Sequence, residues 1–154
     1  VLETTFKEET ETDLFGEQVV LTGIIPMIIN ESFKVLLEAG YSPVVSWFVS
    51  FYEVKQITDL LSTMSIDEFY KAVSDTAEYG GLSRSDSLLS DEFKNEMKVA
   101  LSSIQSGDFH AEWQKEAERG YKELDKLRGK LKKSPINDIT KEMLNLLKKN
   151  KNDS

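Results

Sequence analysis

The chain has 154 residues, of which 40% are hydrophobic and 10% aromatic, and this is enough to bury the core of one domain. Its formal charge is −8, with 27 acidic residues against 19 basic ones, which argues against a nucleic-acid-binding protein because no basic stripe can displace counterions from phosphates. The absence of cysteine excludes disulfide bonds, zinc thiolate sites and a thiol nucleophile, and we expect a reducing, cytoplasmic location.

No uninterrupted apolar run reaches the roughly 20 residues of a spanning helix, and the start is acidic and polar, unlike a signal peptide, so we expect a soluble protein with no membrane contact.

The N-terminal third of the chain predicts helices. From Asp13 to Ala39 apolar residues recur at helical intervals, and Gly40 is placed to end the run. Because Pro26 suits the first turn of a helix better than its interior, we expect two helices with a break near Gly23.

The middle of the chain predicts a long helix, a shorter helix and a loop. Residues 44–64 run without a helix breaker after a turn at 41–43. The sequence Ser-Ile-Asp-Glu at 65–68 has the form of a capping box, which predicts a helix from there to about Ala77. Residues 79–90 are rich in glycine, serine and aspartate and have no sustained period, so they predict a loop.

The C-terminal part predicts four more helices. Ser90 can cap a helix that ends at Gly107, and we expect further helices over 109–118, 121–132 and 135–149. The last residues have no apolar anchor, so we assign 1–147 to the domain and 148–154 to a mobile tail. With no convincing strand, the sequence predicts an all-α domain of about seven or eight helices.

Most familiar catalytic motifs are absent. The sequence has no glycine-rich phosphate loop, no Gly-x-Gly-x-x-Gly fingerprint and no His-Glu-x-x-His zinc pair. The only histidine, His110, has no second histidine with which to share a metal, and we interpret it as a structural or surface residue. A serine hydrolase is therefore not expected.

Carboxylates are the remaining candidates for chemistry. Asp13 and Glu17 lie four residues apart, which on a helix places them on one face, where they repel each other unless a cation lies between them. Hard divalent metals bind such oxygens, although a solvated acidic face has the same spacing. Glu53 lies in an otherwise apolar stretch and needs a metal, an ion-pair partner such as Lys55 or a position at the edge of the core. Residues 74–80 are polar and can also be explained as the end of a helix leading into a loop.

The opening of the chain resembles a known family. The run from Glu3 to Gln18, ETTFKEETETDLFGEQ, resembles the start of the C-terminal helical domain of ketol-acid reductoisomerase, also called acetohydroxy-acid isomeroreductase. Further segments follow in the family's order: LEAGYSP at 37–43, YEVK at 52–55 with Asp59-Leu60, SDTAEYG at 74–80, IQSGDF at 104–109 with Glu112-Trp113, and SPI at 134–136. The resemblance extends to about Leu147, and such order over most of the chain argues against an unrelated acidic helical bundle.

The resemblance implies an architecture and an activity. Family members join an N-terminal Rossmann domain, which holds NADPH, to a helical C-terminal domain that is knotted or intertwined with its dimer mate. Only the second part is present here, so we expect a homodimer or higher homo-oligomer, with the Rossmann domain as partner in the full-length protein. The implied reaction uses two Mg²⁺ ions to convert an acetohydroxy acid of the 2-acetolactate type to a 2,3-dihydroxy acid, by alkyl migration and hydride reduction, on the way to valine and isoleucine.

The resemblance also implies roles for individual residues. Asp13 and Glu17 match the first acidic pair of the metal site, with Asp13 bridging both ions. Glu53 matches the last acid of the second pair, which the other subunit supplies in the family's short form. Ser74 matches the serine that contacts the substrate, flanked by Val73 and Ala77.

The chain departs from the family pattern in three places. The family carries a glutamate where this chain has Val49, so we expect the second Mg²⁺ to bind more weakly. Asp75 stands where the family more often has asparagine, and residues 81–90 do not follow the usual pattern. The alternative to a catalytic domain is a non-catalytic paralogue or stand-alone dimerisation module with a degraded metal site.

Overall fold

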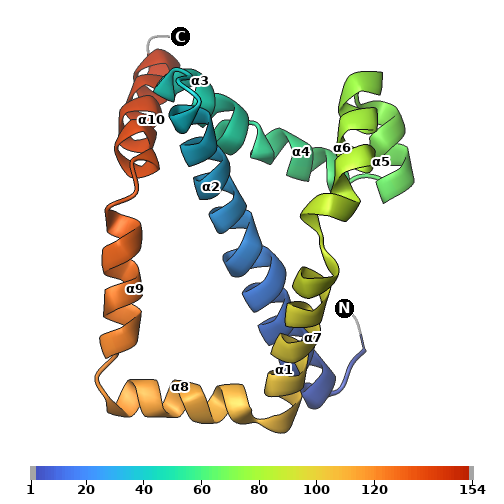
Figure 1. The fold of residues 1–154 in the computed structure, drawn as a ribbon, viewed down its shortest axis with the longest axis vertical. Coiled ribbons are helices and arrows are strands. Elements are labelled where there is room, and N and C mark those ends of the chain that lie inside the picture. Colours follow the sequence, from blue (N-terminus) through green and yellow to red (C-terminus); the bar gives the residue numbers. More distant parts are fainter. Residues whose placement is uncertain (1–2, 153–154) are drawn as a thin grey trace.

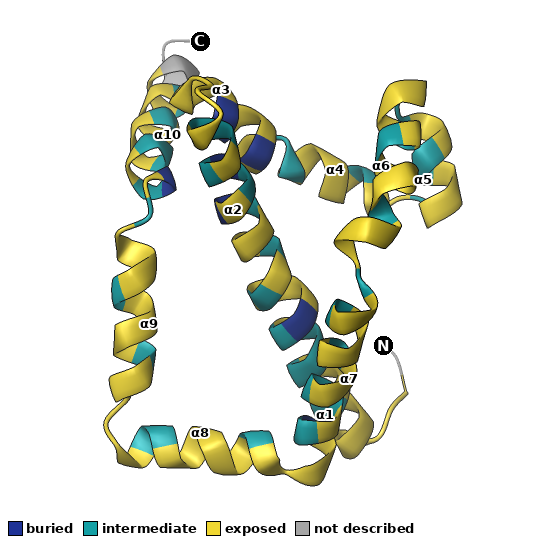
Figure 2. Ribbon diagram, in the orientation of Figure 1, coloured by how far each residue is buried: buried dark blue, intermediate teal, exposed yellow. Residues whose placement is uncertain are grey.

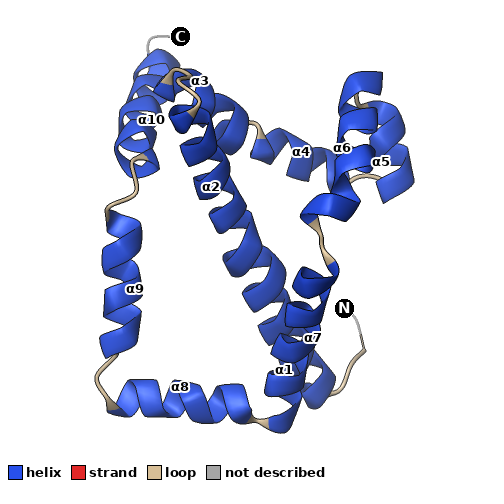
Figure 3. Ribbon diagram, in the orientation of Figure 1, coloured by secondary structure: helices blue, strands red, loops and turns tan. Residues whose placement is uncertain are grey.

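In this computed structural model, which describes residues 3–152, every regular element is a helix (Figures 1 and 3). In chain order the elements are α1 (Phe6–Gly16), the π-helical segment η1 (Glu17–Ile24), α2 (Ile25–Glu38), α3 (Pro43–Trp47), the π-helical segment η2 (Phe48–Tyr52), α4 (Val54–Leu61), α5 (Ile66–Ala72), α6 (Asp75–Leu88), α7 (Asp91–Ser106), α8 (Asp108–Glu118), α9 (Lys122–Lys132) and α10 (Ile136–Asn152). Counting α1–η1–α2 as one helix and α3–η2–α4, interrupted only by a turn at Glu53, as another, the described residues form eight helices. The expected all-α class and number of helices are confirmed.

The first two α-helices are joined by a π-helical segment without a break. Segments α1, η1 and α2 form one continuous helix from Phe6 to Glu38, which crosses the middle of the view in Figure 1. Pro26 lies in the first turn of α2, as expected for a residue without an amide hydrogen. The predicted break near Gly23 is wrong, because the backbone there changes from i→i+4 to i→i+5 hydrogen bonds and continues in the same direction.

The predicted helix over 44–64 is interrupted. It begins with α3 and, after a π-helical turn in η2 and a turn at Glu53, continues as α4 to Leu61. Hydrophobic periodicity cannot reveal such a turn, because a single widened turn changes the phase of the helix without introducing a breaker residue.

The loop predicted over 79–90 is wrong, since α6 runs through it to Leu88. The helix predicted from Ser65 to Ala77 is two helices, of which α5 begins with the expected capping box. Helix α6 begins anew after Ser74, whose hydroxyl accepts the N–H of Ala77 at 3.3 Å. A Cβ at Gly81 would lie 3.2 Å from Cε1 of Tyr70, so this glycine permits close packing of α6 on α5.

The later helices agree with the prediction within a few residues. Ser90 caps α7 by accepting the N–H of Phe93 at 3.3 Å, and α7 ends at Gly107, whose φ of 84° lies in the left-handed region. Helix α10 continues to Asn152 and so extends into the segment expected as a tail, while residues 153–154 lie outside the described part.

The core is small and lies at one corner of the molecule. Phe33 of α2, Trp47 of α3 and Ile136 of α10 are buried together, and partly buried residues packed against them are Ile29, Leu37, Ile139, Met143 and Leu147. The indole Nε1 of Trp47 donates a hydrogen bond to Oγ1 of Thr140 at 2.8 Å. Figure 2 shows few other buried positions along the frame of helices.

A large apolar surface is left uncovered. The accessible area is 12155 Å², whereas a compact folded monomer of 17.5 kDa exposes about 7,900 Å². The helix from Phe6 to Glu38 is long and apolar enough to cross a membrane by length and composition alone, with 17% of its most apolar window buried. Helices that pack on a partner chain pass the same criterion, so the excess exposed area is the more informative observation.

Candidate metal and substrate site

The first acidic pair lies at the junction between α1 and η1. Asp13 is in α1 and Glu17 is the first residue of η1, and the N–H of Glu17 donates to the carbonyl oxygen of Asp13. The two side chains therefore lie one α-helical turn apart on the same face. Both are exposed, and within the described residues neither carboxylate has a hydrogen-bond or ion-pair partner, whereas nearby Glu11 pairs with Lys7. These oxygens are available to a cation.

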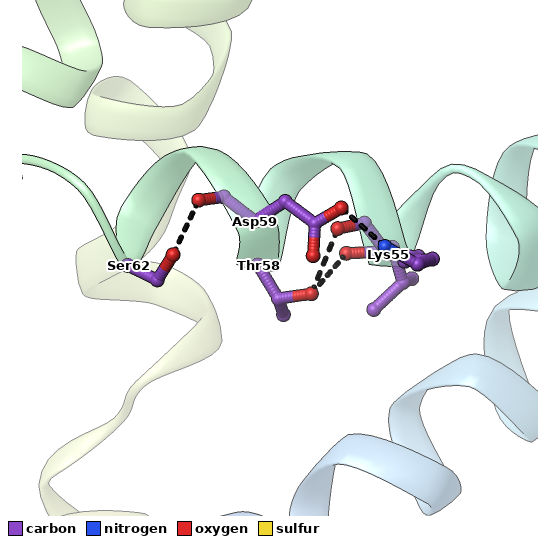
Figure 4. A network of polar contacts seen from close by, with 5 residues as sticks. Lys55, Thr58, Asp59 and Ser62 are labelled. Atoms are coloured by element: carbon purple, nitrogen blue, oxygen red, sulfur yellow. Dashed lines mark hydrogen bonds and ion pairs between the residues drawn. The ribbon is translucent and has the colours of Figure 1, made fainter.

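The third acid, Glu53, follows η2 directly. Its N–H donates to the carbonyl oxygen of Phe48 at 3.1 Å, which is an i→i+5 bond, and its side chain is half-buried. Lys55 forms an ion pair with Asp59 on its own helix (Figure 4), so the expected alternative of a Glu53–Lys55 pair is wrong. The Glu53 carboxylate has no partner in the described part of the chain.

Val49 lies one turn before Glu53 and contributes no oxygen ligand. It is 47% exposed and, with Glu53, lines a shallow cavity of about 350 Å³, whose other lining residues are Val54, Gln56 and Ile57. A cation beside Glu53 would therefore face an apolar wall where a carboxylate would be needed.

Aromatic stacking fixes η2 and therefore the start of α4, a feature that the sequence did not lead us to expect. The ring of Trp47 stacks on Phe51 with centroids 5.4 Å apart and lies 5.6 Å from Tyr52, which also stacks on Phe48 at 5.1 Å. The fully buried indole thus orients the segment that ends at Glu53. The spacing of these aromatic residues could have indicated the cluster.

A single chain does not bring the three acids together. Segment η2 packs on α2, α3 and α4, whereas α1 packs on α7, so Glu53 and the acidic pair lie near opposite ends of the long helix. From residue 13 to residue 33 this helix advances about 30 Å, at 1.5 Å per residue. Over residues 3–152 there is no group of three or more histidine or acidic side chains that could hold a metal. Carboxylate oxygens are donors of the type that Mg²⁺ prefers, and each chain presents them in two separate places.

The predicted substrate residues lie at the start of α6. The Ser74 hydroxyl accepts the Ala77 N–H and keeps its own proton for another acceptor, while Val73 is half-buried and Ala77 exposed. Their contact with substrate stays a prediction. His110 is exposed on α8, consistent with a surface residue.

Comparison with known proteins gives consistent matches. Residues 6–149 match the family model described as ketol-acid reductoisomerase, C-terminal domain. The ketol-acid reductoisomerase (NADP(+)) of Methanocaldococcus jannaschii is 44% identical over 143 residues, which cover 93% of this chain and 43% of the relative. That of Pyrobaculum calidifontis is 46% identical over 147 residues, covering 96% and 45%. Among solved structures, an NADH-preferring ketol-acid reductoisomerase from an uncultured archaeon has a TM-score of 0.89 at 37% identity, covering 94% of this chain and 44% of that one. The chain thus spans less than half the length of these relatives.

Proposed function

The chain belongs to the ketol-acid reductoisomerase family as its C-terminal domain, and from this we propose that it forms the metal- and substrate-binding part of an enzyme converting acetohydroxy acids to 2,3-dihydroxy acids. The observation that carries the proposal is the family match over 6–149 combined with three carboxylates, at Asp13, Glu17 and Glu53, that have no partner among residues 3–152. The acetohydroxy acid is of the 2-acetolactate type, and the pathway is that to valine and isoleucine in the cytoplasm.

In this proposal the acids of two chains form one site. Asp13 and Glu17 of one copy and Glu53 of another would hold Mg²⁺, and the Ser74 hydroxyl would donate a hydrogen bond to the substrate. When bound, Mg²⁺ would supply Lewis-acid polarisation of the ketone and hydroxyl oxygens of the substrate. The NADPH that supplies the hydride would be held by a Rossmann domain of the full-length protein.

The excess accessible area supports assembly into a homodimer or higher homo-oligomer. The difference from a compact monomer is about 4,000 Å² per chain, which is in the range of obligate interfaces. The exposed apolar side chains of the long helix, among them Leu21, Ile24 and Ile28, are then covered by a second copy. Sedimentation of the isolated chain tests this part, and particles of only 17.5 kDa at micromolar concentration would refute it.

Calorimetric titration of Mg²⁺ into the full-length protein tests the metal site. We expect Asp13→Asn to weaken Mg²⁺ binding at least tenfold, because it removes one of the carboxylates proposed to hold the metal. Glu142→Gln, which removes an exposed carboxylate on α10 with no partner in the described part of the chain, is the matched control and should leave the affinity within twofold. Equal affinities of the parent and Asp13→Asn would refute the site.

Val49 favours the second candidate, a non-catalytic paralogue that keeps the helical module for assembly. Val49→Glu places a carboxylate one turn before Glu53, and a functional site should then bind a second Mg²⁺ several-fold more tightly. An unchanged Mg²⁺ titration and unchanged turnover in Val49→Glu would support the paralogue.

A further inference from the structure

The two segments that carry the proposed metal ligands share a rare backbone form. Glu17 is the first residue of the π-helical segment η1, and Glu53 directly follows the π-helical segment η2. π-Helices account for well under 1% of residues in globular proteins and are frequent at functional sites. Their occurrence at both of these places points to a role in aiming these side chains.

Two residues of η1 make its wide turns possible. Thr22 donates its hydroxyl hydrogen to the carbonyl oxygen of Glu17 at 2.9 Å, and the N–H of Ile25 reaches the carbonyl oxygen of Val20. At Gly23 an added Cβ would overlap the carbonyl oxygen of Gln18 and lie 2.8 Å from its carbonyl carbon. A side chain at position 23 is therefore incompatible with this backbone path.

The wide turns set the rotation between the two ends of the long helix. A π-helical turn holds one more residue than an α-helical turn, which changes the phase of the subsequent helical residues by about 100°. Helix α1 packs on α7 while α2 packs on α3, η2 and α10, so both ends are held by separate neighbours. Glu17 lies at the change itself, because its N–H forms an α-helical bond to Asp13 and its carbonyl oxygen accepts the Thr22 hydroxyl.

We propose that Gly23 is a positioning residue for the metal site: by permitting η1, it fixes the direction in which Asp13 and Glu17 project relative to the end of the molecule that carries Glu53. The proposal rests on the proposed function, since it assigns the direction of the acids that the metal requires. Gly23 touches neither metal nor substrate and acts through the backbone of Gln18.

Calorimetric titration of Mg²⁺ into the full-length protein, with circular dichroism and sedimentation on the same samples, tests the proposal. Gly23→Ala should weaken Mg²⁺ binding at least tenfold while helical content and assembly are kept. The matched control is Gly16→Ala on the same helix, where an added Cβ has open space within 4 Å and the affinity should stay within twofold. A folded, assembled Gly23→Ala protein with parental Mg²⁺ affinity would overturn the proposal.

A second variant keeps the test decisive if Gly23→Ala does not fold. Thr22→Val removes the hydroxyl bond to Glu17 without steric overlap and should weaken Mg²⁺ binding about threefold. Thr58→Val, which removes a similar hydroxyl bond to the backbone of α4, is its control. If Thr22→Val keeps the parental Mg²⁺ affinity while Asp13→Asn loses Mg²⁺ binding, the role of η1 is overturned and the proposed metal site stands. If the parent protein itself binds no Mg²⁺, both proposals are overturned.

Discussion

The hydrogen bond that the buried indole of Trp47 donates to Thr140 gives the sharpest stability prediction. The indole of Trp47 is fully buried, and its N–H donates to Oγ1 of Thr140 at 2.8 Å. Thr140→Val keeps the shape of the side chain but leaves the indole N–H without this acceptor. A buried donor left unpaired costs about 1–3 kcal/mol, so we expect Thr140→Val to lower the free energy of unfolding by about that amount.

A double-mutant cycle separates this hydrogen bond from packing. Trp47→Phe removes the donor, and Thr140 is only half-buried, so water can satisfy its hydroxyl. In the Trp47→Phe protein, Thr140→Val should therefore cost less than about 0.5 kcal/mol, which gives a coupling energy of about 0.5 kcal/mol or more.

Urea unfolding of the full-length protein at one fixed protomer concentration measures these differences, because assembly contributes to apparent stability. Thr58→Val, whose hydroxyl is exposed and bonds to its own helix, should change the free energy of unfolding by less than about 0.5 kcal/mol. If Thr140→Val lowers the free energy of unfolding by the same amount in the parent protein and in the Trp47→Phe protein, the assigned hydrogen bond is refuted.

Three further substitutions give predictions of definite sign. Gly107→Ala should destabilise the protein by about 1–2 kcal/mol, because φ is 84° there, whereas Gly129→Ala within α9 should stabilise it by about 0.5–1 kcal/mol; urea unfolding checks both. The Ser65 hydroxyl, as the largest cause, lowers the pKa of Asp67 and of Glu68. Their contribution to stability is present above the ordinary pKa values of 3.8 and 4.5 and is lost as the pH falls through the lowered values. Ser65→Ala should raise both pKa values in an NMR titration and make the free energy of unfolding fall less steeply with decreasing pH. Unchanged pKa values would contradict this assignment.

Local signals in the sequence predicted much of the fold. The capping box at Ser65, the cap at Ser90 and the left-handed Gly107 each act within one turn of chain, so their spacing was sufficient to place helix ends. The helix α6 was missed because paired glycines usually indicate a loop, whereas Gly81 makes room for Tyr70 of α5. Such a close approach between two helices has no local pattern.

The candidate site was only partly accessible from sequence. Resemblance supplied Asp13, Glu17 and Glu53 and their proposed roles, but neither spacing nor resemblance indicated the π-helical segments beside them. A widened turn shifts the phase of the apolar pattern without introducing a breaker residue, so periodicity did not distinguish it from a continuous α-helix. The separation of the acids within one chain likewise depends on the packing of α2, which no local window contains.

The corner where α10 meets α2 and α3 brings together segments that lie far apart in the chain. The Trp47–Thr140 contact joins residues 93 positions apart, and closing a flexible loop of that length carries an entropic cost of about 4 kcal/mol. This contact between α10 and α3 is therefore expected to form late in folding, after the individual helices have formed.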